Sequence, residues 1–315
     1  MDLGLRPFAW CGWRLDVPTD WRPFMIDGNA RTGAAGLADE NQRRLVLQWH
    51  ALRKPPSLKR IKQMLVQDAL PRRRAALAAS VEPVEHADLH LFHRLRDEEG
   101  GVTRFAGWSP VSGRLIDAMY RRSTPRQDRL VEPALVALMD QPPDQPQQWA
   151  YFDTSFVAPA GMIYRSASLK FGDMGIELDR PRRKGVRAAS VVVRVVYPAD
   201  LALSRMPIDQ WLAMFLAQDR PRYRPPRDPR GPEHNYEPLR TTLGPGLTCD
   251  APLRLPLQWT RWTTPRLLRS ELFHDAARNR LILLQTFAHP DEAEALLTEL
   301  RNGLYWAGDR STPSP

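Results

Sequence analysis

The fold is decided by the segment LDVPTDW (Leu15–Trp21), because its pattern of a strand, a proline and a bulky residue returns as FVAPAGM (Phe156–Met162). A second pair of segments follows in the same order and at nearly the same spacing: GAAGL (Gly33–Leu37) and GDMGI (Gly172–Ile176). Solenoid repeats have periods of about 20–50 residues. A repeat as long as this one predicts two structurally similar α+β halves in one chain.

Further along, each half continues with a strand and then a helix. RRLVLQW (Arg43–Trp49) and SVVVRVV (Ser190–Val196) are β-rich runs of strand length without a helical period. After each run, apolar residues recur at the spacing of one helical face. These residues are Leu58, Ile61, Met64 and Leu65 in the first half, and Ile208, Trp211, Leu212 and Phe215 in the second.

Each half then carries a second group of strands and a closing helix. The predicted strands are Val102–Trp108, Leu115–Tyr120, Leu257–Trp262, Ser270–His274 and Leu281–Phe287, and the closing helices are Leu130–Met139 and Pro290–Leu300. The glycine pairs at Gly33–Gly36 and Gly172–Gly175 are interpreted as a repeated turn between strands. The predicted fold class is α+β, with two similar halves that are each a mainly antiparallel sheet packed with helices.

Proline-rich segments suggest how the chain is divided. We expect a first α+β repeat at residues 1–140, a Pro/Gln-rich linker at 141–149, a second repeat at 150–306 and a flexible tail at 307–315. Within the second repeat, the segment Arg220–Pro238 is rich in proline and arginine and is predicted to be an extended surface loop.

Several functional classes lack support in the sequence. There is no signal-peptide pattern, no apolar run long enough to span a bilayer, and no phosphate-binding loop, dinucleotide fingerprint, nucleophile elbow or HExxH motif. The two cysteines, Cys11 and Cys249, are interpreted as small buried side chains, and most of the ten tryptophans as core residues. These features predict a cytoplasmic protein that is not an enzyme, has no cofactor and does not bind a membrane.

Basic residues give the candidate binding sites. Lys and Arg number 45 against 36 Asp and Glu, for a formal net charge of +9. An arginine beside an aromatic side chain can clamp a phosphate and stack on a base, so anion binding is one interpretation, and a solvated surface is the other. The candidate anion-binding residues are Arg72, Arg73 and Arg74, then Arg182, Arg183 and Lys184, and finally Arg222, Arg224 and Arg227.

One histidine cluster is a candidate metal site. On a strand, His86, Asp88 and His90 share one face and form a set of two histidines and one carboxylate. On a helix, His86, His90 and His93 line up instead. The alternative is a polar surface strand that binds no metal.

Taken together, the strand that ends in Val-Pro-x-x-Trp (Val17–Trp21), the glycine-bearing hairpin, and the helices and antiparallel strands that follow resemble the PsbP-like fold. Photosystem extrinsic subunits, Ran-binding Mog proteins and small bacterial proteins share this fold, and here the pattern occurs twice. The resemblance implies an antiparallel sheet flanked by helices, in a family whose members mostly bind other proteins. No functional residue of the family can be matched to a position in this chain.

Two functions therefore compete. The first is a non-catalytic cytoplasmic binding or assembly protein that acts through contacts with a protein partner. The alternative is an arginine-mediated nucleic-acid or polyanion-binding protein, which requires the basic clusters to lie on one surface.

Overall fold

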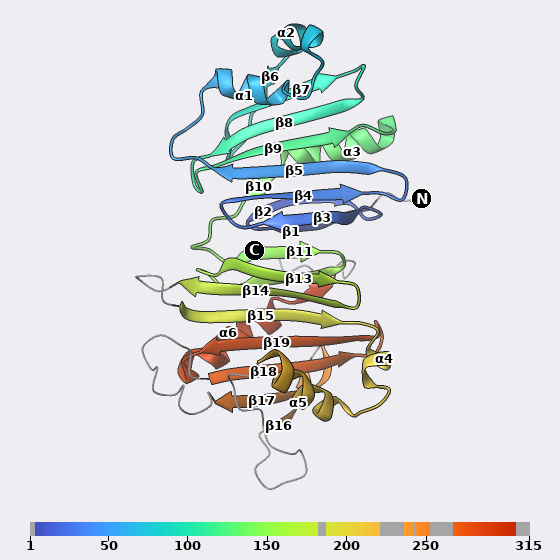
Figure 1. Cartoon of the computed structure of the whole chain (residues 1–315), viewed down its shortest axis with the longest axis vertical. Coiled ribbons are helices and arrows are strands. Elements are labelled where there is room, and N and C mark those ends of the chain that lie inside the picture. The colour runs from blue at the N-terminus through green and yellow to red at the C-terminus, as the bar shows by residue number, and fades with distance from the viewer. Residues whose placement is uncertain (1–3, 182–186, 221–235, 242, 253–266, 307–315) are drawn as a thin grey trace. The chain divides into compact units, whose positions relative to one another are not determined.

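The chain is an α+β protein in a computed structural model that describes residues 4–181, 187–220, 236–241, 243–252 and 267–306 (Figure 1). These residues form three antiparallel sheets and six helices. The chain divides into two compact units: unit 1 comprises residues 1–157 and 304–315, and unit 2 comprises residues 158–303. Each unit is described by itself below.

A six-stranded sheet of two hairpins and two short strands contributes the most aromatic part of unit 1. Its strands, in sheet order, are β10 (Met139–Asp140), β2 (Trp13–Pro18), β1 (Leu5–Trp10), β11 (Gln147–Tyr151), β12 (Thr154–Ala158) and β20 (Tyr305–Trp306). Trp10 lies edge-on to Trp149 and Tyr151, with ring centroids 5.4 and 5.9 Å apart. All three rings are fully buried, so they fix the pairing of the two hairpins.

Unit 1 also contains a seven-stranded sheet with three helices. Its strands, in sheet order, are β3 (Arg22–Gly28), β4 (Thr32–Ala38), β5 (Arg43–Ala51), β9 (Arg114–Arg121), β8 (Val102–Ser109), β7 (His90–Asp97) and β6 (Glu82–Pro83). The helices are α1 (Leu58–Leu65), α2 (Pro71–Ala79) and α3 (Pro125–Val136). Helix α1 buries Ile61 and Leu65 in a cluster with Leu95 of β7 and Ala106 of β8, which attaches it to the sheet through the apolar face seen in its sequence.

Unit 2 is built around the other seven-stranded sheet. Its strands, in sheet order, are β13 (Ile163–Lys170), β14 (Asp173–Pro181), β15 (Arg187–Val196), β19 (Arg280–Ala288), β18 (Leu267–Asp275), β17 (Gly244–Pro252) and β16 (Tyr236–Thr241). Its helices are α4 (Ala199–Leu203), α5 (Ile208–Asp219) and α6 (Pro290–Asn302). Counted from its own first strand, this sheet has the same strand order as the sheet of β3–β9.

Most of the predicted elements are present. The strands predicted at Arg43–Trp49, Ser190–Val196 and Leu281–Phe287 are β5, β15 and β19, and the helix predicted from Ile208 is α5 with Trp211 and Leu212 buried. The first closing helix starts at Pro125, five residues before its predicted start, because Thr124 caps it and Pro125 occupies the first helical position. The strand predicted at Leu257–Trp262 and the tail predicted at 307–315 lie outside the described residues.

The glycine segments are predicted to be turns. This is correct for Gly172, but it is wrong for Gly33 and Gly36, which lie inside β4, and for Gly175, which lies inside β14. A Cβ atom at Gly33 would lie 2.5 Å from the ring of Trp49, and one at Gly36 would lie 2.4 Å from the ring of Phe24. The strand therefore has glycine where aromatic rings pack directly on its backbone.

The proline-rich segments differ in part from expectation. The last residues of the predicted linker, from Gln147 on, already belong to β11, and the two units divide after Val157. Pro238 was expected in an extended loop but lies in β16, an edge strand, where a proline costs no ladder hydrogen bond on the outer side. The rest of that loop, residues 221–235, lies outside the described chain. Among the described helices, none has the length and apolar character needed to cross a membrane.

Candidate functional site

The first basic cluster contributes to the fold of unit 1. Arg73 of α2 forms ion pairs with Asp97 at the end of β7 and, at 3.3 Å, with Glu99. Arg74 donates hydrogen bonds to the carbonyls of Gln67 and Ala69 at 2.9 and 3.0 Å. Arg72 is exposed. Arg73 thus holds the end of β7, and Arg74 holds the backbone that precedes α2.

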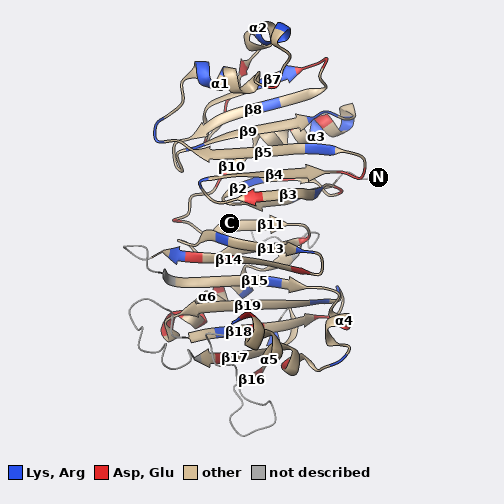
Figure 2. Cartoon of the chain, viewed as in Figure 1, with Lys and Arg blue, Asp and Glu red and all other residues tan. Residues whose placement is uncertain are grey.

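The other two clusters, Arg182, Arg183 and Lys184 and then Arg222, Arg224 and Arg227, lie outside the described residues. Whether the three clusters share one surface stays a prediction. Figure 2 shows the described lysines and arginines spread over several helices and strands, interspersed with acidic residues.

The histidine cluster lies mostly in an irregular segment, because β7 begins only at His90. The Nδ1 atom of His86 accepts hydrogen bonds from the backbone N–H groups of Asp88 and Leu89 at 3.0 and 3.1 Å, and its Nε2 atom lies 2.8 Å from the carbonyl oxygen of Leu138. Both ring nitrogens therefore hold the backbone. Among the described residues, no group of three His, Cys, Asp or Glu side chains is placed to hold a metal ion.

Both cysteines are free and buried, as predicted. Burial raises the pKa of the Cys11 thiol far above its usual range, and it raises the pKa of Cys249 to about 12. A thiolate is the nucleophilic form of cysteine, so neither side chain is activated at neutral pH.

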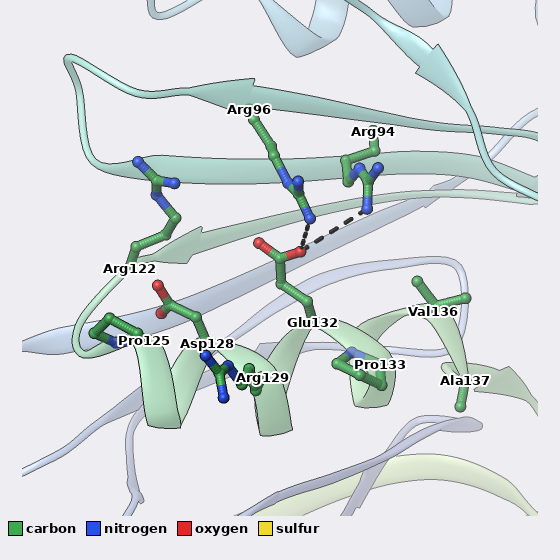
Figure 3. Close-up of a pocket in the computed structure, with 10 residues that line it drawn as sticks. All are labelled: Arg94, Arg96, Arg122, Pro125, Asp128, Arg129, Glu132, Pro133, Val136 and Ala137. Carbon is green, nitrogen blue, oxygen red and sulfur yellow. Dashed lines mark hydrogen bonds and ion pairs between the residues drawn. The ribbon is translucent and has the colours of Figure 1, made fainter.

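Sequence analysis missed a groove in unit 1, which lies between α3 and residues of β7 and the end of β9 (Figure 3). We call it the α3 groove. Its volume is about 750 Å³. It is lined by Arg94, Arg96, Arg122, Pro125, Asp128, Arg129, Glu132, Pro133, Val136 and Ala137.

Local structure places the arginines on the sheet side of the groove. Arg94 and Arg96 are two residues apart on β7, so they project from the same face of the strand. Arg122 directly follows β9 at the start of the connection to α3. Figure 3 shows Arg94 and Arg96 pointing from the sheet toward Glu132 on the helix.

The two carboxylates of the α3 groove are held by partners within unit 1. Glu132 accepts a hydrogen bond from Arg96, another from Thr103 at 3.2 Å, and lies 3.8 Å from Arg94. Asp128 accepts hydrogen bonds from the hydroxyl of Tyr120 at 2.6 Å and from the N–H of Ser123 at 3.1 Å. These bonds tie α3 to the seven-stranded sheet through both oxygens of Glu132 and one oxygen of Asp128.

The guanidinium groups keep N–H donors that form no hydrogen bond within the described residues. Arg94 and Arg122 each donate to an exposed carboxylate, Glu82 and Glu98 respectively, and the bond to Glu98 raises the pKa of Arg122. Arg129 is exposed, and within the described part of the chain no hydrogen bond or ion pair is recorded for it. A guanidinium carries five N–H donors, so the groove offers cationic donors that the fold does not use.

A signal for this site was present in the sequence. The alternation HRLRD at His93–Asp97 places two arginines on one face of a strand, and RRSTPRQDR at Arg121–Arg129 combines a helix cap with four more arginines. In the sequence, β8 and most of β9 lie between the two segments. Only the tertiary structure brings the segments together at the groove.

Comparison with known proteins gives no family. No family model matches the chain, and no curated protein matches it. The resemblance to the PsbP-like fold stays a prediction.

One solved structure covers nearly the whole chain. It is the immunity protein TplEi of T6SS from Pseudomonas aeruginosa, complexed with "L" peptide. The two share 10% sequence identity, and the match spans 96% of this chain and 98% of that one at a TM-score of 0.30. A likeness at this TM-score carries no argument about function.

Proposed function

We propose that the chain is a non-catalytic binding protein, and that its α3 groove receives part of a protein partner. The observation that carries the proposal is the groove itself: an open cavity of about 750 Å³ whose lining includes the apolar side chains of Pro125, Pro133, Val136 and Ala137. A concave surface that combines apolar side chains with a few polar groups is the usual kind of binding site in proteins.

The chemistry of the described side chains supports a binding role over a catalytic one. The thiols of Cys11 and Cys249 are held protonated by burial. His86 uses both ring nitrogens on the backbone, and Glu132 is held by Arg96 and Thr103. A general base or nucleophile must instead be free to approach a substrate. Free thiols also suit the reducing cytoplasm, where we expect the protein to act.

We further propose that the chain arose by duplication of one α+β unit. Two observations support this. The seven-stranded sheets have the same strand order, and the proline turns carry the same hydrogen bond, from Trp21 N to Pro18 O at 3.1 Å and from Met162 N to Pro159 O at 3.3 Å. Trp21 and Met162 are both fully buried.

Partner capture with a blocked groove tests the binding proposal. The full chain carrying Ala137→Trp places a bulky ring in the α3 groove, whereas Ala295→Trp adds the same ring to an exposed position on α6. Tagged wild type and both variants are expressed in the native cell and purified with and without nuclease.

We expect one protein to co-purify with wild type and with the α6 variant, to resist nuclease, and to be lost with the groove variant. A partner retained by both variants would contradict the role of the groove. Capture that disappears after nuclease treatment would instead favour the nucleic-acid alternative.

A further inference from the structure

We infer that the α3 groove recognises an acidic segment of the partner, with Arg129 as a direct contact for its carboxylates. This inference rests on the proposed function and adds the chemistry of the ligand. The lining contains four arginines against two carboxylates, and both carboxylates are already held within unit 1. Outside the lining, Arg94 and Arg122 also pair with Glu82 and Glu98. The charge that stays available to an anionic ligand is therefore that of Arg129, together with the unused N–H donors of the other arginines.

The shape of the donors favours carboxylates. A guanidinium binds a carboxylate through two parallel N–H bonds, which gives both strength and a fixed orientation. The side chain of Arg96 is 44% exposed although it binds Glu132, and Arg129 is exposed on the facing helix. The lining thus carries exposed guanidinium donors on both β7 and α3, which suits an extended segment with several acidic side chains.

The apolar wall distinguishes a peptide from a nucleic acid. Proteins that bind single-stranded nucleic acid stack bases on aromatic side chains, and the lining of the α3 groove contains no aromatic residue. Its apolar residues are two prolines, a valine and an alanine, which suit the aliphatic part of a peptide beside its acidic groups.

The corresponding place in unit 2 shows that topology does not require this positive charge. Thr103 on β8 and Arg269 on β18 each lie six residues before the end of their strand, so they occupy corresponding positions. Thr103 is paired with Arg96 on β7, and Arg269 is paired with Asp250 on β17. Arg269 donates two hydrogen bonds of 2.7 Å to Asp250 and also binds Glu294 of α6.

The helices α3 and α6 also differ in the charge of a corresponding residue. Arg129 is the fifth residue of α3 and Glu294 is the fifth residue of α6. The cavity beside Arg269 has a volume of about 190 Å³, and its charged lining is Glu237, Asp250 and Arg269. In unit 2 the helix thus presents a carboxylate that pairs with an arginine of the sheet, where α3 presents Arg129.

Peptide binding by the intact chain tests the inference. The probe is fluorescein-labelled hexaglutamate, followed by anisotropy at low ionic strength, with labelled hexaglutamine and labelled oligothymidylate as comparison probes. Arg129→Glu reverses the charge in the groove. Arg126→Glu makes the same change on the same helix, at an exposed residue that does not line the groove.

We expect hexaglutamate but not hexaglutamine to bind wild type. Arg129→Glu should weaken that binding roughly tenfold or more, since a hydrogen bond to a charged group contributes about 1.5–3 kcal/mol and a factor of ten corresponds to about 1.4 kcal/mol. Arg126→Glu should weaken it clearly less than Arg129→Glu does, because Arg126 does not line the groove and cannot contact the ligand there. Both variants should keep the thermal midpoint of wild type, since both residues are exposed.

Three results would overturn the inference: no binding of hexaglutamate by wild type, an equal loss in the two variants, or Arg129-dependent binding of oligothymidylate in preference to hexaglutamate. None of these three results by itself contradicts the proposed function. A partner that is lost with Ala137→Trp but binds Arg129→Glu normally would leave the groove as a docking site and remove only its preference for acidic ligands.

Discussion

Arg114 joins several segments of unit 1. It lies at the start of β9 and donates hydrogen bonds to the carbonyl oxygens of Cys11 at 2.6 Å and Ala30 at 3.2 Å. It also binds the carboxylate of Asp140, and its guanidinium stacks on Trp13 at 4.5 Å. One buried cation thereby joins the β1–β2 turn, the β3–β4 turn and β10.

Removing the carboxylate of Asp140 should lower the free energy of unfolding. The side chains of Arg114 and Asp140 are 5% and 0% exposed, so Asp140→Ala leaves a buried charge without its counter-ion. Loss of one partner from a buried pair costs about 3–5 kcal/mol. We expect the free energy of unfolding, measured by urea titration, to fall by about that amount.

The matched control for Asp140→Ala is Glu98→Ala. This change removes the partner of Arg122, but the Glu98 side chain is 71% exposed, and such pairs contribute about 0–1 kcal/mol. Equal losses in the two variants would show that Arg114 is solvated or that other groups compensate its charge.

At the level of elements, α3 has a double role. It buries Val131 and Leu135 and packs beside β2 of the six-stranded sheet, and it presents Arg129 and Glu132 to the groove. Its start is fixed by Thr124, whose hydroxyl accepts a hydrogen bond from the N–H of Gln127 at 3.3 Å.

The cap of α3 can be tested by two substitutions. Thr124→Ala removes the acceptor and should lower the free energy of unfolding by about 1 kcal/mol. Thr124→Ser keeps a hydroxyl acceptor and should stay close to wild type. Urea unfolding gives the free energies, and hydrogen exchange at the first turn of α3 should speed up only in the alanine variant. Unchanged exchange in both would mean that the Pro125 ring alone fixes the start of the helix.

At the level of the whole molecule, each unit has its own hydrophobic core. In unit 1, Trp149 contacts Trp10 and stacks on Phe156 with centroids 6.3 Å apart. In unit 2, Trp211 of α5 belongs to a cluster with Leu212 and Leu272, and stacks on Phe215 at 5.2 Å. Contacts concentrated within each unit predict that each unfolds as a cooperative body.

Truncating one tryptophan in each core tests this division. Trp149→Ala and Trp211→Ala should each cost about 3–5 kcal/mol in the unit that holds the residue. Hydrogen exchange followed by mass spectrometry should show faster exchange in peptides from residues 4–157 for the first variant and from residues 158–303 for the second. Loss of protection along the whole chain in either variant would mean that the units unfold together.

The sequence by itself determined most of the elements, because their signals are local. The apolar spacing from Leu58 predicted α1, the run of valines at Val191–Val196 predicted β15, and Pro290 with Asp291 predicted the start of α6. Period and capping depend on residues within one or two turns, so they can be read without knowing the fold. The burial of Cys11 and Cys249 was predicted in the same way.

Only the tertiary structure decided the candidate site and the roles of single residues. Gly33 is predicted from the sequence to be a turn residue, but it lies inside β4, where the ring of Trp49 packs on its backbone. Arg73 looked like an anion ligand, but it pairs with Asp97 and Glu99. Arg96 lies on β7 and Arg129 on α3, and only the folded chain brings these two elements to one groove. Charge pairing and cavity shape depend on such long-range contacts, and a local pattern in the sequence does not encode them.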